Sequence, residues 1–248
     1  MELKTWKLWM HFGGYFLCFV IAGLIAAIPR FIIGFENETG LIVLITELLR
    51  IPISLILLFS YTKYISKIPI NKETLQLSSF SPLKWGLVGI ILPLTVLSIF
   101  YLTGNLTVIS TNFQISQEVI LDNIFKAFGM SLAAGIIEEV VFRGYLVNLL
   151  TKKYTFWFSA IFPSFLFTLI HIGGADSLLN VIQLMIAGML VSIMFLVIYK
   201  KTGSIWNASI VHFLWNFLNL NELVDYGKSN EPTHKMMEIS PHFEKVFK

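Results

Sequence analysis

Apolar runs long enough to cross a membrane recur along the whole chain, and polar residues are concentrated between them. A helix of roughly 18 or more apolar residues can cross about 30 Å of hydrocarbon. A helix also satisfies its own backbone hydrogen bonds where water is absent, and the runs lack the short alternation of a membrane barrel. The pattern therefore predicts an all-α, polytopic transmembrane bundle of about seven spans, at residues 8–28, 41–61, 83–102, 127–150, 154–172, 178–199 and 204–220.

The same pattern divides the chain into three parts. Residues 1–126 contain the first three spans and end in a polar segment, 103–126, which is expected to be an extracytoplasmic loop. Residues 127–220 contain four spans whose apolar runs are interrupted by charged residues and histidines. Residues 221–248 form a polar tail of mixed charge. No part of this division is expected to be a separate soluble domain.

Composition supports the membrane interpretation. Of the 248 residues, 56% are hydrophobic and 13% are charged, and the mean hydropathy is +0.75. The net charge of +3 comes mostly from lysines near the ends of the runs, so we expect a lipid bilayer and no nucleic acid as partner. Cys18 is the single cysteine, which excludes an intramolecular disulfide and a cysteine-based zinc site.

Lysines mark every second connection between the runs. They occur before the first span and near Lys63, Lys152 and Lys200, whereas the other connections carry acidic residues, with Arg30 as the exception. Cytoplasmic loops of membrane proteins are enriched in Lys and Arg. We therefore predict a multi-pass protein with a cytoplasmic N-terminus. The small chain without a eukaryotic targeting signal suggests a bacterial plasma membrane.

The fourth run carries Glu138, Glu139 and Arg143. Each charge at the centre of a membrane helix costs roughly 2.5 to 3.5 kcal/mol, so such residues are functional by default. Glu139 and Arg143 are four residues apart, in the favourable order for an intrahelical ion pair. Glu138 is then left without a helical counter-charge, as a general base would be. The alternative is a structural ion cluster that braces the bundle.

Two further runs place polar side chains within apolar surroundings. His171 follows Phe167 by one helical turn, and His212 precedes Asn216 by one turn, so each pair shares one face of its helix. An imidazole and a carboxamide together can stabilise a developing oxyanion. Either histidine could instead form a hydrogen bond between helices.

Together these groups suit a buried hydrolytic centre. The sequence contains neither a Gly-x-Ser-x-Gly nor a His-Glu-x-x-His motif, which argues against a serine hydrolase and a zincin protease. Water activated by a carboxylate is the economical mechanism.

The motifs resemble those of the CAAX proteases and bacteriocin-processing enzymes, the CPBP or Abi family. The resemblance covers about residues 127–220 and implies an intramembrane endopeptidase, with an active site buried between helices. The family's Glu-Glu-x-x-x-Arg, Phe-x-x-x-His and His-x-x-x-Asn motifs fall on Glu138, Glu139 and Arg143, on Phe167 and His171, and on His212 and Asn216.

The resemblance also implies a catalytic role for each of these polar residues. No cofactor is favoured, and the substrate is expected to be a secreted or membrane-tethered peptide or protein. Glu138 with His171 would activate the attacking water, His212 with Asn216 would hold the oxyanion, and Glu139 with Arg143 would organise the site.

Three questions stay open at this point. Glu138, His171 and His212 could be the ligands of an open zinc site. A non-proteolytic role, as a bacteriocin immunity or scaffold protein or as a proton-coupled carrier, is the alternative function. The three side chains also lie at different expected depths, about 18, 25 and 12 Å from the cytoplasmic ends of their spans, so tilt or a re-entrant turn at Gly173 and Gly174 must reconcile them.

Overall fold

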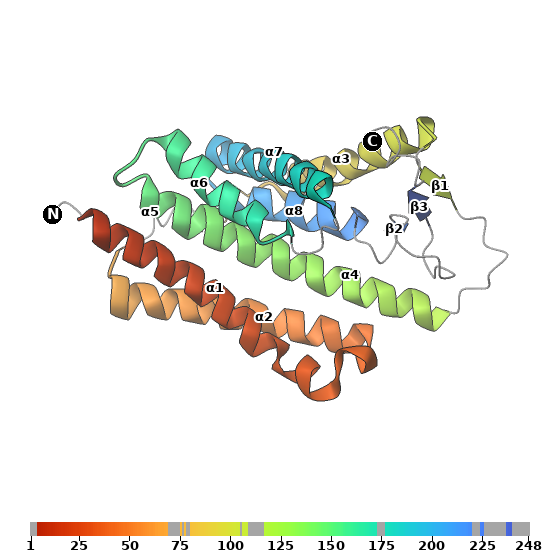
Figure 1. The fold of residues 1–248 in the computed structure, drawn as a ribbon, viewed down its shortest axis with the longest axis horizontal. Helices are drawn as coiled ribbons and strands as arrows, with labels where there is room; N and C mark the ends of the chain where they lie inside the picture. Colours follow the sequence, from red (N-terminus) through yellow and green to blue (C-terminus); the bar gives the residue numbers. More distant parts are fainter. Residues whose placement is uncertain are drawn as a thin grey trace.

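The structure is a computed structural model that describes residues 4–68, 75, 77, 80–104, 106–108, 117–172, 177–219, 224–225 and 237–239. Long helices dominate it, and Figure 1 shows them lying roughly along one direction. They are α1 (Thr5–Ile33), α2 (Gly40–Ser60), the π-helix η2 (Tyr61–Ser66), α3 (Pro82–Leu102), α4 (Gln117–Glu138), the π-helix η4 (Glu139–Val147), α5 (Asn148–Leu150), α6 (Phe156–Leu169), α7 (Leu178–Thr202) and α8 (Ile205–Asn219), with a 3-10 turn, η1, at Phe35–Asn37.

Four helices of the described residues are long and apolar enough to cross a bilayer. They are α1, α2 continued by η2, α3 and α7, whereas α6 is apolar but has only 14 residues. The protein is therefore a helical membrane protein, as predicted. The count of seven spans stays a prediction, because α4 with η4 carries charges and α6 and α8 are short.

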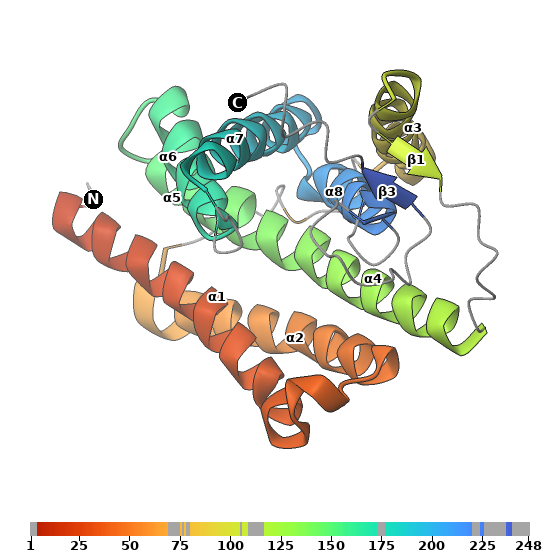
Figure 2. The ribbon, with the colours of Figure 1, turned by 45° about the vertical axis from the view of Figure 1, so that its right-hand side comes forward.

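The continuous helix formed by α4, η4 and α5 lies at the centre of the bundle. Helices α1 and α2 cover one side of it, and α3, α6, α7 and α8 cover the other (Figures 1 and 2). All nine residues of η4 are buried, including Glu139 and Arg143. Because neighbouring helices surround η4, its charged side chains face protein partners instead of lipid.

Helices α2 and α4 run side by side in the same direction. Gly40 lies against the backbone of Asp122, and a Cβ on Gly129 would come within 2.8 Å of the Cα of Leu44. Glycine at these two positions permits the close approach of the two backbones. The contacts also fix the register of the two helices. The position of a residue along the axis of α2 can therefore be compared with positions along α4.

The start of α4 corrects the predicted loop at 103–126, because the helix begins at Gln117. Asp122 forms an ion pair with Lys126 at 2.9 Å and accepts a hydrogen bond from the backbone N–H of Gly40. Partial burial alone would raise the pKa of Asp122, but these two partners hold it below its usual range. They stabilise a helical turn that the polar sequence did not indicate.

Three short strands form a small sheet in the order β1-β3-β2, from β1 (Leu106–Val108), β2 (Val224–Asp225) and β3 (Met237–Ile239). Strand β3 pairs antiparallel with β1 and parallel with β2. The sheet joins the segment after α3 to the predicted tail. Most of the tail, and Gly173 and Gly174, lie outside the described residues.

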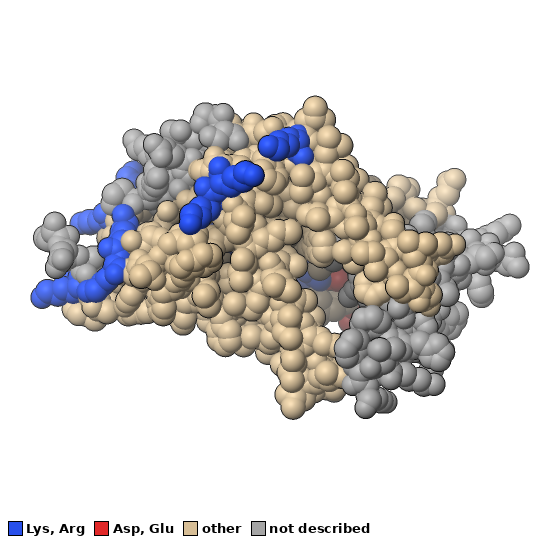
Figure 3. All heavy atoms as spheres, turned by 90° about the horizontal axis from the view of Figure 1, so that it is seen from above, with Lys and Arg blue, Asp and Glu red and all other residues tan. Residues whose placement is uncertain are grey.

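Basic side chains gather toward one end of the bundle, on the left in Figure 3. Lys63 lies in η2, Lys152 follows α5, and Lys200 is in the last turn of α7. Arg30, the exception, forms a bidentate pair with Glu38 through Nε at 2.7 Å and Nη2 at 3.0 Å. Its charge is therefore compensated locally. A cytoplasmic location for the basic end remains a prediction.

Candidate active site

Arg143 is fully enclosed by partners from three helices. Its Nη1 donates to Glu139 Oε1 at 2.9 Å, and its Nη2 donates to the backbone carbonyl and the hydroxyl of Ser192 at 2.9 and 2.7 Å. Its guanidinium lies over the rings of Phe167 and Phe195. The arrangement compensates a buried charge by pairing, hydrogen bonds and cation–π contacts, and it connects η4 to α6 and α7.

Glu138, the last residue of α4, is buried but has an unused oxygen. Its Oε2 has no hydrogen-bond partner among the described residues. The Nε2 atoms of His212 and His171 lie 3.8 and 4.0 Å from this oxygen. These distances are too long for direct hydrogen bonds, and a water molecule about 2.8 Å from both partners fits either gap.

His212 lies between the two glutamates. Its Nδ1 is 3.0 Å from Glu139 Oε1, and since an ionised carboxylate can only accept, Nδ1 is the donor. Its ring stacks on Phe195 with 4.5 Å between centroids. Glu139 thus fixes the imidazole so that Nε2 points to the space beside Glu138.

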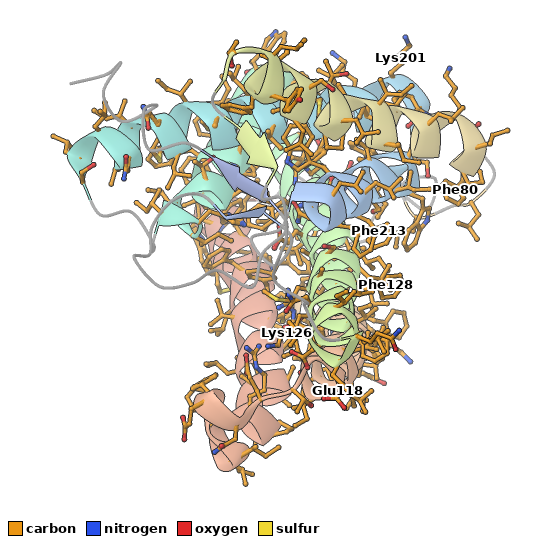
Figure 4. The ribbon with its side chains drawn as sticks, turned by 90° about the vertical axis from the view of Figure 1, so that its right-hand side faces the viewer. Phe80, Glu118, Lys126, Phe128, Lys201 and Phe213 are labelled. Carbon is orange, nitrogen blue, oxygen red and sulfur yellow. The ribbon has the colours of Figure 1, made fainter. Side chains whose placement is uncertain are left out.

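A close crossing of α4 and α8 places His212 there. A Cβ added to Gly135 would lie 2.9 Å from the backbone N of Phe213 and the backbone O of Ser209, so the two helices approach with no side chain between them. Two turns earlier on α4, Phe128 meets Phe213 edge to face, and Figure 4 labels both rings. The contact between α4 and α8 therefore extends over about two turns of α4 before Glu138.

His171 departs from its predicted position. Helix α6 ends at Leu169, short of the predicted end at residue 172, and His171 occupies the following turn with 49% of its side chain exposed. Its Nδ1 donates to the carbonyl of Phe167 at 2.6 Å, and its ring packs on the ring of Phe167. With the proton on Nδ1, the neutral ring presents an acceptor at Nε2 toward Glu138.

Asn216 is the predicted site residue that the structure does not connect to the others. It lies one turn beyond His212 on α8, half-buried, and forms no hydrogen bond with the described residues. The other predicted residues, Glu138, Glu139, Arg143, His171 and His212, are brought together by the contacts above.

The start of α8 bears on the expected difference in depth between His212 and the other site residues. Ile205 and Asn207, at its start, are fully buried. The indole N–H of Trp206 donates to the carbonyl of Leu75 at 2.8 Å, and Asn207 accepts from the backbone N–H of Ser81 at 2.9 Å. The helix thus begins inside the protein, so the number of residues before His212 on α8 does not give its depth in a membrane.

The residues fit a tetrahedral zinc ion poorly. Zinc–ligand bonds of about 2.0 to 2.2 Å separate ligand atoms by about 3.3 to 3.6 Å, whereas Glu138 Oε2 lies 3.8 Å from His212 and 4.0 Å from His171. Among the described residues, no group of three or more His, Cys, Asp or Glu is placed to hold a metal. No step of the chemistry is therefore derived through a metal.

The sequence analysis missed two sets of residues. Ser192, which binds Arg143, carries no sequence signal, because a serine in an apolar helix is common. Glu47 and Arg50 on α2 were detectable, since they are two charges inside an otherwise apolar span. Glu47 is buried, and Glu138 is among the charges that act on it electrostatically.

The site-bearing segment matches a known family. Residues 120–218 match the family model described as type II CAAX prenyl endopeptidase Rce1-like. No curated protein and no solved structure matches the chain. The match confirms the resemblance found from the motifs of α4, η4, α6 and α8. The segment that carries the candidate active site is therefore similar to the Rce1-like family of CAAX proteases.

Proposed function

We propose that the protein is an intramembrane endopeptidase in which Glu138 activates water to hydrolyse a membrane-associated peptide or protein. The supporting observation is the buried Oε2 of Glu138, which has no protein hydrogen-bond partner among the described residues and faces two imidazole Nε2 atoms across gaps that fit water. A carboxylate that needs no structural partner can act as a base.

In this proposal each of these groups takes part in the hydrolysis of the peptide bond. Glu138 takes a proton from the water as its oxygen attacks the peptide carbonyl carbon, while His171 Nε2 accepts a hydrogen bond from the second water hydrogen. The C–N bond then breaks as Glu138 returns the proton to the leaving nitrogen, giving a carboxylic acid and an amine. Burial of the Glu138 side chain strengthens its interactions with the water and the peptide.

His212 stabilises the oxyanion in this proposal. Because its Nδ1 donates to Glu139, a proton on Nε2 makes the ring an imidazolium. The charges of His212 and Arg143 then balance those of Glu138 and Glu139. Asn216, with no hydrogen bond to a described residue, supplies a second donor when substrate is bound. Glu139 and Arg143 act by holding His212.

The basic end of the bundle is proposed to face the cytoplasm of a bacterial cell. Lys63, Lys152 and Lys200 at that end support this orientation. Cysteines introduced beside Lys152 in a Cys18→Ser background should react only after the membrane is made permeable. Labelling from outside intact cells would contradict the orientation.

Comparative peptidomics of membranes tests the proposed activity. Cells with the wild-type protein should contain cleavage products that are absent from cells with Glu138→Gln at equal abundance, and 1,10-phenanthroline should leave the products unchanged. Identical peptide profiles would contradict the proposal and favour an immunity, scaffold or carrier role. Loss of products with the chelator would restore the zinc alternative.

A further inference from the structure

Arg50 is an arginine inside the membrane-spanning part of the protein with unused hydrogen-bond donors. It lies ten residues into α2, about 15 Å along the axis from Gly40. Its single ion pair joins Nη1 to Glu47 Oε2 at 3.0 Å, and this oxygen accepts no hydrogen bond. Arg50 therefore donates no hydrogen bond to a described residue, although a guanidinium carries five N–H groups.

Arg30, the second arginine near Glu47, has different partners. Arg30 forms its bidentate pair with Glu38 and also lies 3.7 Å from Glu47 Oε1. Arg30 and Arg50 have nearly equal side-chain exposure, 20% and 21%. The guanidinium of Arg30 thus forms two hydrogen bonds to one carboxylate, and the guanidinium of Arg50 does not.

Arg50 lies close to the level of Glu138. Leu44 contacts Gly129 in the parallel pair of α2 and α4. Arg50 is about 9 Å further along α2, and Glu138 is about 13.5 Å further along α4, so the two differ by about 4.5 Å along the axes. The electrostatic interaction between Glu47 and Glu138 agrees with this proximity.

Charged groups are also reachable from outside. Figure 3 shows a hollow in the face turned to the viewer, right of centre, with red and blue atoms inside it. One-fifth of the Arg50 side chain is exposed. Arg50 lies near the middle of α2, about 15 Å along the axis from Gly40, and close to the level of Glu138, so a substrate of the proposed site is a better partner than a lipid headgroup.

We propose that Arg50 binds a carboxylate group of the peptide substrate, either its C-terminus or an acidic side chain near the cleaved bond. The planar fork of a guanidinium matches a carboxylate through two parallel hydrogen bonds. The inference rests on the proposed peptidase function, because it assigns a binding residue to that site.

The test uses the full-length protein in proteoliposomes and three mixtures of synthetic peptides built from Ala, Leu, Val and Phe in random order. One mixture has free C-termini, a second is amidated, and a third is amidated but contains one Glu in each peptide. Wild type should cleave the first or the third mixture about tenfold or more faster than the second. The faster mixture identifies the source of the carboxylate.

Variants distinguish the effect of Arg50 on the rate of cleavage from that of Arg30. Arg50→Gln should cleave all three mixtures at the slow rate, whereas Arg30→Gln, whose fork is already occupied, should retain the preference. Equal rates for wild type on all mixtures, or a preference that survives Arg50→Gln, would overturn the inference. If Arg50→Gln does not fold, Arg50→Lys, which keeps charge without the fork, should weaken the preference, and an unchanged preference counts against Arg50.

Failure of the proposed function gives a different result. In that case wild type cleaves no mixture. Binding of the three mixtures to Glu138→Gln, measured by tryptophan-fluorescence melting, then still decides the inference. Greater stabilisation by the carboxylate-bearing mixtures supports Arg50 as a binding residue, and equal shifts contradict it.

Discussion

Arg143 in η4 and Arg50 in α2 both lie in helices of the bundle, but the protein surrounds them in different ways. Arg143 is 2% exposed and donates hydrogen bonds to Glu139 and to both oxygens of Ser192. Arg50 is 21% exposed and has an ion pair to Glu47 without a hydrogen bond. A satisfied arginine fixes its neighbours, whereas an unsatisfied one is available to a ligand. We therefore expect Arg143 to stabilise the fold and Arg50 to bind substrate.

Replacement of Arg143 should have the largest effect on folding. Arg143→Ala leaves Glu139 buried without its ion pair, which typically costs about 3 to 5 kcal/mol. Abundance, detergent melting temperature and activity should all fall. Ser192→Ala, which removes one of the three hydrogen bonds, should cause a smaller loss of the same kind. A wild-type melting curve for Arg143→Ala would show that the pair is not structural.

His212 shares Glu139 with Arg143 but is proposed to act on the reaction. His212→Ala should reduce the turnover rate by about 10²-fold or more through loss of oxyanion stabilisation. Glu139 keeps Arg143 as partner, so abundance should change little. A large fall in melting temperature with a normal rate per folded molecule would place His212 in the structural group.

Replacement of Arg50 should affect stability much less than replacement of Arg143. Glu47 is buried but retains Arg30 at 3.7 Å, so Arg50→Ala should cost less than the roughly 3 to 5 kcal/mol expected for Arg143→Ala. Melting of purified protein in detergent measures the difference. A loss equal to that of Arg143→Ala would remove the contrast between the two arginines.

The partly exposed ion pair between Asp122 and Lys126, near the start of α4, should contribute least to stability. The lowered pKa of Asp122 means that its contribution is present above the ordinary Asp pKa of about 3.9 and is lost as the pH falls through the lower folded value. Asp122→Asn should lower stability by a few tenths of a kcal/mol at neutral pH. The difference from wild type should vanish in acid. Glu118→Gln, at an exposed position of the same helix, is the control.

The motifs predicted which polar side chains come together better than the apolar runs predicted where the helices begin and end. Glu139 with Arg143 was predictable because a four-residue spacing determines a helical pair. His171 beyond the end of α6, and the buried start of α8 before His212, depend on packing against other segments, which hydropathy does not encode. The helical turns before residue 127 depend on the contact of Asp122 with Gly40, which is distant in sequence.

The central claim, that Glu138 is the water-activating base, is tested most directly by purified Glu138→Gln and Glu139→Gln in parallel assays of cleavage and melting. The account predicts that Glu138→Gln melts like wild type and loses activity by about 10²-fold or more, because an amide keeps the shape without the base. Glu139→Gln should melt at a lower temperature, since Arg143 and His212 lose their carboxylate. Near-normal turnover by Glu138→Gln, with an inert but fully stable Glu139→Gln, would contradict the account and make Glu139 the base.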